Sequence, residues 1–210
     1  MKKSRYPKAV SFSKSQINKY GDVLRYSNGD IDTFEEAFDG VSAWRAAHLY
    51  PLNTFRTTLT RRANSLSPLN HPIVAQRLKR MPTIINKLLR NPEMELSRMQ
   101  DIGGLRVIVD NLKCVYALKA YYEEARLPHK LVNQKDYILE PKKDGYRGIH
   151  LVFRYVGLNS VAKTYNGSLI ELQIRTKLQH TWATAVEVAG LMLQRKLKND
   201  DGDKLWLDFF

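Results

Sequence analysis

Apolar residues follow two different spacings along this chain. From residue 13 to residue 98 they recur every three or four positions, which is the spacing of amphipathic helices. Ser13, with Gln16 three positions later, forms a capping box that predicts where the first helix begins. Beyond residue 98, short segments alternate apolar and polar residues as half-buried strands do. We expect strands over residues 105–109, 135–140, 149–156 and 169–175.

Alternation within two of these strands separates an apolar side from a polar side. In residues 169–175 the apolar positions are 170, 172 and 174, and the opposite side carries Glu171, Gln173 and Arg175. In residues 149–155 the same pattern places His150 and Arg154 opposite three apolar side chains. Two such polar faces side by side would form the floor of a binding site. The alternative is an antiparallel sheet with one side in water.

Helical segments precede these strands and are interspersed with them. We expect helices over residues 32–49 and 112–126, another with Pro51 in its first turn, and a last one over residues 177–198. Turn-forming residues between positions 64 and 72 separate an N-terminal helical lobe, residues 1–66, from a core of residues 67–210. Strands and helices alternate in that core, so the pattern predicts an α/β fold.

The composition indicates which class of binding partner and which cellular compartment to expect. The 210 residues carry a formal net charge of +13, which favours polyanionic partners such as nucleotides, RNA or an anionic membrane surface. The apolar runs are too short to cross a bilayer and no signal-peptide pattern follows the first residues, so we expect a cytoplasmic protein that does not cross a membrane. Cys114 is the single cysteine; it excludes an internal disulfide and is expected in a helix.

A glycine turn within residues 135–147 is rich in cations. Asp144 and Gly145 form the turn, since glycine adopts positive φ readily, and basic residues flank it: Lys135, Lys142, Lys143 and Arg147. Such cations can bind phosphates while Tyr146 stacks on a base. The alternative is a basic hairpin exposed to solvent.

A further basic cluster spans residues 76–87. The helical pattern continues to residue 81, and Pro82 is expected to open a new helix. Arg77 and Lys79 would then lie beside a helix N-terminus, where the backbone dipole suits an anion. The alternative is an ordinary charged helix face in solvent.

These segments, taken in order, carry a resemblance to a known family. The sequence resembles the synthetase domain of the RelA/SpoT family, whose members make the alarmones ppGpp and pppGpp, and its N-terminal part resembles that of the small single-domain and toxin-type members. Four motifs match: Arg77-x-Lys79-x-x-x-Thr83-Ile84-x-x-Lys87; Asp101 with Arg106; Lys135-Asp-Tyr-Ile with Pro141-Lys142 and Gly145-Tyr146-Arg147-x-x-His150; and Glu171-x-Gln173-x-Arg175-Thr176.

The resemblance implies a fold and a reaction. The fold is a nucleotidyltransferase-like mixed β-sheet of about five strands flanked by helices, an ordinary size for a sheet. In the implied reaction, the ribose 3′-hydroxyl of GDP or GTP attacks the β-phosphorus of ATP, so that pyrophosphate is transferred and AMP leaves. Asp101 and Glu171 would be the catalytic residues and would hold Mg²⁺.

The resemblance also divides the binding residues between two substrates. ATP would contact Arg77, Lys79, Lys87, Arg106 and Lys142. The acceptor would contact Lys135, Tyr146, Arg147, His150, Gln173 and Arg175, with Tyr146 stacked on its base.

The chain departs from the family pattern in its last expected helix. His180, Thr184 and Glu187 share one helical face there, but Glu187 does not match the usual motif, so its role stays open. The sequence also lacks the His-Asp dipeptide of the family's hydrolase domain, and we expect no hydrolysis of the product.

Two alternatives to an enzyme that uses GDP or GTP as acceptor stay open. Toxin-type members transfer pyrophosphate to the 3′-terminal adenosine of tRNA, an acceptor that the core motifs do not separate from GDP. The net charge and the basic N-terminal residues favour this acceptor: Lys2, Lys3, Arg5, Lys8 and Lys14. Such an enzyme would imply an antitoxin protein or a C-terminal regulatory segment, and the apolar residues 205–210 predict that the natural chain continues. The other alternative is a nucleotide-binding or RNA-binding module without catalysis.

Overall fold

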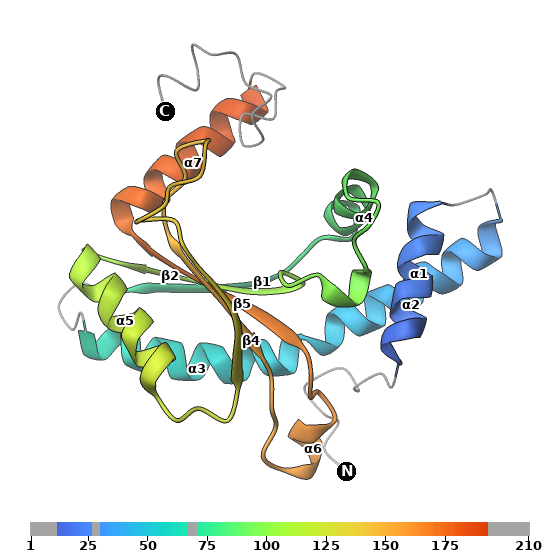
Figure 1. The fold of residues 1–210 in the computed structure, drawn as a ribbon, viewed down its shortest axis with the longest axis horizontal. Coiled ribbons are helices and arrows are strands. Elements are labelled where there is room, and N and C mark those ends of the chain that lie inside the picture. The colour runs from blue at the N-terminus through green and yellow to red at the C-terminus, as the bar shows by residue number, and fades with distance from the viewer. Residues whose placement is uncertain (1–11, 27–29, 67–70, 193–210) are drawn as a thin grey trace.

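The structure is a computed structural model that describes residues 12–26, 30–66 and 71–192 (Figure 1). Its helices are α1 (Lys14–Arg25), α2 (Ile31–Ala47), α3 (Leu49–Leu66), α4 (Met81–Arg90), the 3₁₀-helix η1 (Leu96–Arg98), α5 (Leu112–Glu124), α6 (Ser160–Lys163) and α7 (Lys177–Met192). Its strands are β1 (Ile73–Leu78), β2 (Gly103–Val109), β3 (Lys130–Asp136), β4 (Ile149–Arg154) and β5 (Leu169–Thr176). Of the basic N-terminal residues, Lys14 begins α1, whereas Lys2, Lys3, Arg5 and Lys8 lie outside the described residues, as do the apolar residues 205–210.

The strands form one mixed sheet in the order β1-β2-β5-β4-β3. β2 and β5 are parallel, and the other three neighbouring pairs are antiparallel. A parallel pair needs a long crossover connection, and here the chain between β2 and β5 contains α5, β3, β4 and α6. The predicted five-stranded mixed sheet flanked by helices is therefore confirmed.

One face of the sheet forms the main hydrophobic core. The residues that the sequence pattern assigned to the apolar side are buried there: Leu151, Phe153, Tyr155, Ile170, Leu172 and Ile174. They share a cluster with residues of α3 and α5, among them Phe55, Leu59 and Leu118. Figure 1 shows α3 and α5 below the sheet, whereas α4 and α7 rise on the opposite side. The polar residues of the same strands face that opposite side.

A second hydrophobic cluster joins α1 and α2 to α4 and η1. Ile17 of α1, Val41 of α2 and Leu88 of α4 are buried together in it. The Ser13 side chain accepts a hydrogen bond from the backbone N–H of Gln16, which confirms the predicted cap of α1. Helix α3, in contrast, packs into the main core with the sheet. The division of the chain at residue 66 stays a prediction.

Two segments differ from the sequence-based expectation. The helix expected up to residue 81 is wrong for residues 73–78, because this segment pairs along its whole length with β2 as an edge strand. The strand expected over residues 135–140 instead spans Lys130–Asp136. It ends there because the Asp136 carboxylate accepts hydrogen bonds from the backbone N–H groups of Ile138 and Leu139 and so forms a turn.

The helix boundaries are close to the expected ones. Asp30, not Asp32, caps α2, and His48 separates α2 from α3, which has Pro51 in its first turn as expected. Cys114 lies in α5, as expected. The expected extension of the last helix to residue 198 passes beyond the described residues. Among the residues that are described, no helix combines the length and the apolar character needed to cross a membrane.

Candidate functional site

The backbone register lines up polar residues across the sheet. Gln173 of β5 lies between Arg106 of β2 and His150 of β4. His150 pairs in turn with Lys135 at the outer strand β3. One pair further along, Glu171 lies opposite Gly104, whose other partner is Arg77 of β1. Residues that the sequence places up to about a hundred positions apart thus share one polar face.

Asp101 lies just before β2 and is held by two lysines. Lys79 Nζ donates to its Oδ2 at 2.7 Å, and Lys87 Nζ donates to its Oδ1 at 2.9 Å. Lys79 is itself buried and follows β1, while Lys87 projects from α4. Burial alone would raise the pKa of Asp101, but the two ammonium groups outweigh it and lower the pKa below its usual value. Asp101 is therefore a carboxylate at neutral pH.

Glu171 is the second carboxylate of the polar face. His150 Nδ1 donates to its Oε1 at 2.9 Å, and the Gln173 amide donates to its Oε2 at 2.8 Å. Burial and the charge of Asp101 both raise its pKa, yet the contacts with His150 and Gln173 outweigh them and lower it. The repulsion between Asp101 and Glu171 indicates that the two carboxylates belong to one electrostatic centre.

Gln173 links this centre to two guanidinium groups. Its Oε1 accepts from Arg175 at 2.9 Å and from Arg106 at 3.4 Å, while its amide nitrogen bonds Glu171. Arg175 is 5% exposed, and its Nε is buried without a hydrogen-bond partner in the described part of the chain. A buried guanidinium donor without an acceptor is costly, so this position suits an additional oxygen ligand.

The glycine turn folds back onto the same centre. Gly145 has φ of 77°, the positive value for which glycine is suited. With the proton of His150 on Nδ1, the Tyr146 hydroxyl donates to His150 Nε2 at 2.6 Å. The Tyr146 ring is 9% exposed, and burial raises its pKa to about 12. The turn is therefore attached to Glu171 through a chain of two hydrogen bonds.

Cations occupy the space around the Tyr146 ring. The Arg175 guanidinium lies 4.5 Å from the ring centroid and Lys142 Nζ lies 4.9 Å from it. A base could stack on this ring only if one of the two side chains moved. The predicted stacking of Tyr146 on the acceptor base stays a prediction.

The remaining candidate residues lie at the edges of the polar face. Arg77 and Arg106 line a cavity of about 80 Å³ between β1, β2 and β5, together with Gln173. Lys135 is exposed on β3. Arg147 is also exposed, and its guanidinium donates to the carbonyl of Gly145 within its own turn. The side chains of Lys135 and Arg147 are thus the candidates that the structure does not bring into the network.

Two further residues lie at this site: Tyr137, which was not among the predicted site residues, and His180, whose role the sequence left open. Tyr137 packs edge-on against Tyr146 and His150, with ring centroids 5.8 and 5.2 Å apart. Its position in the Lys135-Asp-Tyr-Ile motif was the available signal. His180 of α7 has a lowered pKa because of burial and the nearby charges of Arg106 and Arg175, so it faces this site. Glu187, further along α7, is exposed.

Comparison with known proteins identifies the family. The family model "Region found in RelA / SpoT proteins" matches residues 76–191, which is more than half of the chain and contains every site residue described above. The chain is 38% identical over 119 residues to the GTP pyrophosphokinase YjbM of Bacillus subtilis, covering 53% of this chain and 52% of that protein. It is 30% identical over 141 residues to the GTP pyrophosphokinase YwaC of the same organism, covering 64% and 62%.

Solved structures agree with this assignment. Small alarmone synthetase 1 of B. subtilis superimposes with a TM-score of 0.65 at 25% identity, covering 81% of this chain and 86% of that one. The same synthetase bound to its product pppGpp gives a TM-score of 0.64 at 26% identity, covering 77% and 84%. The chain spans about half the length of the first curated relative it matches. The matched residues, the sheet order and the shared architecture together establish that the chain belongs to the RelA/SpoT family.

Proposed function

We propose that this chain is a pyrophosphokinase that transfers the β,γ-pyrophosphate of ATP to the ribose 3′-hydroxyl of GDP or GTP. The observation that carries the proposal is the pairing of two ionised carboxylates, Asp101 and Glu171, with a ring of cations on one polar face. The names of the relatives support it, since two are GTP pyrophosphokinases and one related structure contains pppGpp.

The reaction needs charge neutralisation and alignment more than covalent participation by the protein. The acceptor O3′ forms a bond to Pβ, the bond between Pβ and the oxygen of the α-phosphate breaks, and AMP departs with that oxygen. The hydroxyl proton is lost to a base. Lys79, Lys87 and Arg106 would stabilise the charge that develops on the phosphate oxygens, as cations do in other phosphoryl-transfer sites.

Magnesium suits the donor chemistry of the polar face. Among the described residues no group of three or more His, Cys, Asp or Glu side chains could enclose a metal ion. Mg²⁺ does not require such a cage, because it is commonly held by one or two carboxylates together with substrate phosphates. We assign Asp101 and Glu171 to this role. The bound ion would neutralise phosphate charge, and Lys79 and Lys87 would then turn from Asp101 towards the phosphates.

The acceptor is assigned to the glycine turn. Tyr146, with Lys142 and Arg175 beside its ring, offers an aromatic surface and two cations for a nucleotide. His150 would keep Glu171 oriented through its Nδ1 while its Nε2 holds the Tyr146 hydroxyl. Binding of a base on the ring would displace one cation, and that cation is then available to the acceptor's phosphates.

The 3′-terminal adenosine of tRNA is the competing acceptor. It offers the same ribose hydroxyl, and the net charge of +13 favours attraction to RNA phosphates. Stacking on Tyr146 tolerates adenine and guanine alike. The two acceptors differ in where their remaining phosphates lie. An assay that offers both acceptors in parallel distinguishes them.

The test is a transfer assay with ATP, Mg²⁺ and three acceptors in parallel: GDP, GTP and deacylated tRNA. We expect 3′-pyrophosphorylated guanine nucleotide, and we expect the Glu171→Gln variant to make much less of it. Label on tRNA alone would move the acceptor assignment to RNA while keeping the chemistry. No transfer to any acceptor, with parent and Glu171→Gln alike, would reject the enzyme and leave the binding-module alternative.

A further inference from the structure

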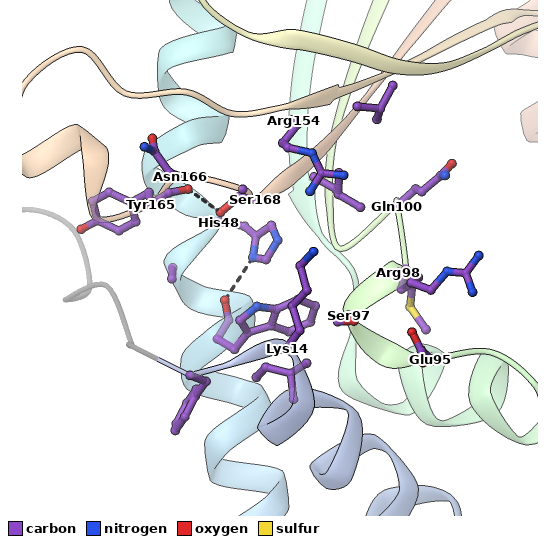
Figure 2. Close-up of a pocket in the computed structure, with 18 of the residues that line it drawn as sticks. Lys14, His48, Glu95, Ser97, Arg98, Gln100, Arg154, Tyr165, Asn166 and Ser168 are labelled. Carbon is purple, nitrogen blue, oxygen red and sulfur yellow. Dashed lines mark hydrogen bonds between the residues drawn. The ribbon is translucent and has the colours of Figure 1, made fainter.

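A cavity of about 520 Å³ lies on the molecule apart from the proposed transfer site. It is bounded by α1, the junction of α2 and α3, η1, the end of β4 and the start of β5 (Figure 2). None of the thirteen candidate residues of the transfer site lines it. Its volume falls within the range of roughly 300–1,000 Å³ that small-molecule sites occupy. The cavity is thus large enough for a molecule of nucleotide size.

Uncompensated positive charge surrounds this cavity. Lys14 of α1, Arg98 of η1 and Arg154 of β4 line it, and Figure 2 shows them on different sides of the space. Glu95 is the single acidic residue of the lining, so three basic groups less one acidic group leave a charge of +2. Among the described residues, none of these three cations has an ion-pair partner. Cations from three separate elements at one cavity favour an anionic occupant.

His48 gives this cavity a buried hydrogen-bond acceptor. The side chain is 2% exposed, and its Nδ1 bonds the carbonyl oxygen of Trp44 at 3.0 Å, so Nδ1 carries the proton. Burial lowers the pKa of His48 to about 4, and the ring is therefore neutral at pH 7. Nε2 is then the nitrogen that can accept a hydrogen bond from a ligand. Figure 2 shows the ring within the lining, between Lys14 and Ser168.

A ligand with a hydrogen-bond donor would suit this acceptor. A neutral imidazole Nε2 pairs with a hydroxyl or amino group but not with a phosphate oxygen that carries no proton. An occupant that offers such a donor in addition to negative charge therefore matches both His48 and the surrounding cations. Aromatic residues complete the lining: Phe12, Trp44 and Tyr165. Rings of this kind provide stacking surfaces for a base.

We propose that this cavity is a second ligand site that binds a nucleotide. Its phosphate contacts Lys14, Arg98 and Arg154, and a ribose hydroxyl or base amino group donates to His48. The base packs against the aromatic lining near Trp44. This site is separate from the ATP and acceptor positions of the proposed function and does not depend on that proposal, because the two sets of residues do not overlap.

The test uses the fluorescence of Trp44 in the full chain. Trp182→Phe and Trp206→Phe leave Trp44 as the single tryptophan, and AMP, GMP, adenosine and inorganic phosphate are the probes. We expect a saturable change with AMP or GMP, and about tenfold weaker binding or worse with adenosine or phosphate alone, since each lacks one set of charged or polar contacts. No saturable change with either nucleotide would overturn the proposal. Equal binding of inorganic phosphate would reduce the cavity to a general anion site and overturn it as well.

Substitutions locate the binding that Trp44 reports. Arg98→Gln with Arg154→Gln should raise the Kd of the nucleotide about tenfold or more, whereas Arg56→Gln, an exposed arginine of α3 outside the cavity, should leave it unchanged. Arg106→Gln, which alters the proposed ATP position, should also leave it unchanged. A Kd that follows Arg106 and ignores Arg98 and Arg154 would contradict a second site. Arg98 is exposed, so Arg98→Gln alone serves if the double variant does not fold.

Discussion

The two faces of β5 differ although their residues alternate along one strand. On one face Ile170, Leu172 and Ile174 are fully buried against α3 and α5. On the other, Glu171, Gln173 and Arg175 form a continuous hydrogen-bonded row. The apolar face depends on volume and close packing, whereas each group of the polar face depends on one specific partner. Substitutions at adjacent positions of β5 should therefore affect stability and chemistry separately.

Glu171→Gln should produce the largest effect, on the polar face. The amide keeps the shape of the side chain but loses the charge, so transfer should fall by about 10²–10³-fold, as when one group that stabilises transition-state charge is removed. The melting temperature should change little. Steady-state rates and thermal unfolding check this, with Glu93→Gln, an exposed carboxylate outside the site, as the matched control. Unimpaired transfer by Glu171→Gln would show that the charge on the polar face of β5 is not needed for the chemistry.

Leu172→Ala should produce the opposite result one position away. Leu172 is fully buried in the main core, and truncation should lower the free energy of unfolding by about 2–5 kcal/mol. Transfer by the folded fraction should stay near the parent value, because no polar contact is lost. Urea unfolding and activity at a permissive temperature measure the two quantities. A loss of transfer as large as that of Glu171→Gln would show that the faces are not separable.

His48 is the polar exception near the apolar core, and it should make stability depend on pH. Burial lowers its folded pKa from 6.5 to about 4, so between these values the unfolded chain binds a proton that the folded chain does not. The contribution of His48 is complete above pH 6.5 and declines as pH falls towards 4, by on the order of 3 kcal/mol. Urea unfolding at several pH values should show a shallower dependence in His48→Gln than in the parent. Equal dependences would contradict this account of His48.

Tyr146→Phe, also on the polar face, should have the smallest effect on transfer. The substitution removes the hydroxyl that holds His150 and keeps the aromatic ring. The loss of one hydrogen bond is worth about 1 kcal/mol, which corresponds to roughly a fivefold slower transfer. Rates measured at saturating acceptor test this. A defect as severe as that of Glu171→Gln would mean that the hydroxyl takes part directly in the chemistry.

The faces of the sheet could be predicted because period-two alternation fixes where each side chain points. The apolar residues that the pattern assigned to one side of β4 and β5 are buried there, and Glu171, Gln173 and Arg175 share the other side. Strand β1 could not be predicted in the same way. It is a short edge strand whose conformation comes from pairing with β2, and that pairing partner lies about thirty residues away.

The partners within the site could not be predicted from spacing. Asp101 contacts Lys87 because the second hydrophobic cluster fixes the position of α4. No local sequence pattern predicts this packing. The contact between the Arg175 guanidinium and the Tyr146 ring depends on how the glycine turn folds over β5. The cavity beside His48 brings together α1, η1 and β4, which are far apart in sequence. Residue types indicated the chemistry, and tertiary packing decided the contacts.

The products formed from ATP and GDP distinguish pyrophosphate transfer from other reactions at the polar face. With ATP labelled in its β-phosphate, we expect the label to enter GDP at the 3′ position and one AMP to appear for each molecule of product. Quantitative chromatography with ³¹P NMR of the product measures both. Formation of ADP with transfer of a single phosphate, or label that stays in ATP when GDP and Mg²⁺ are present, would contradict a pyrophosphokinase site on the polar face.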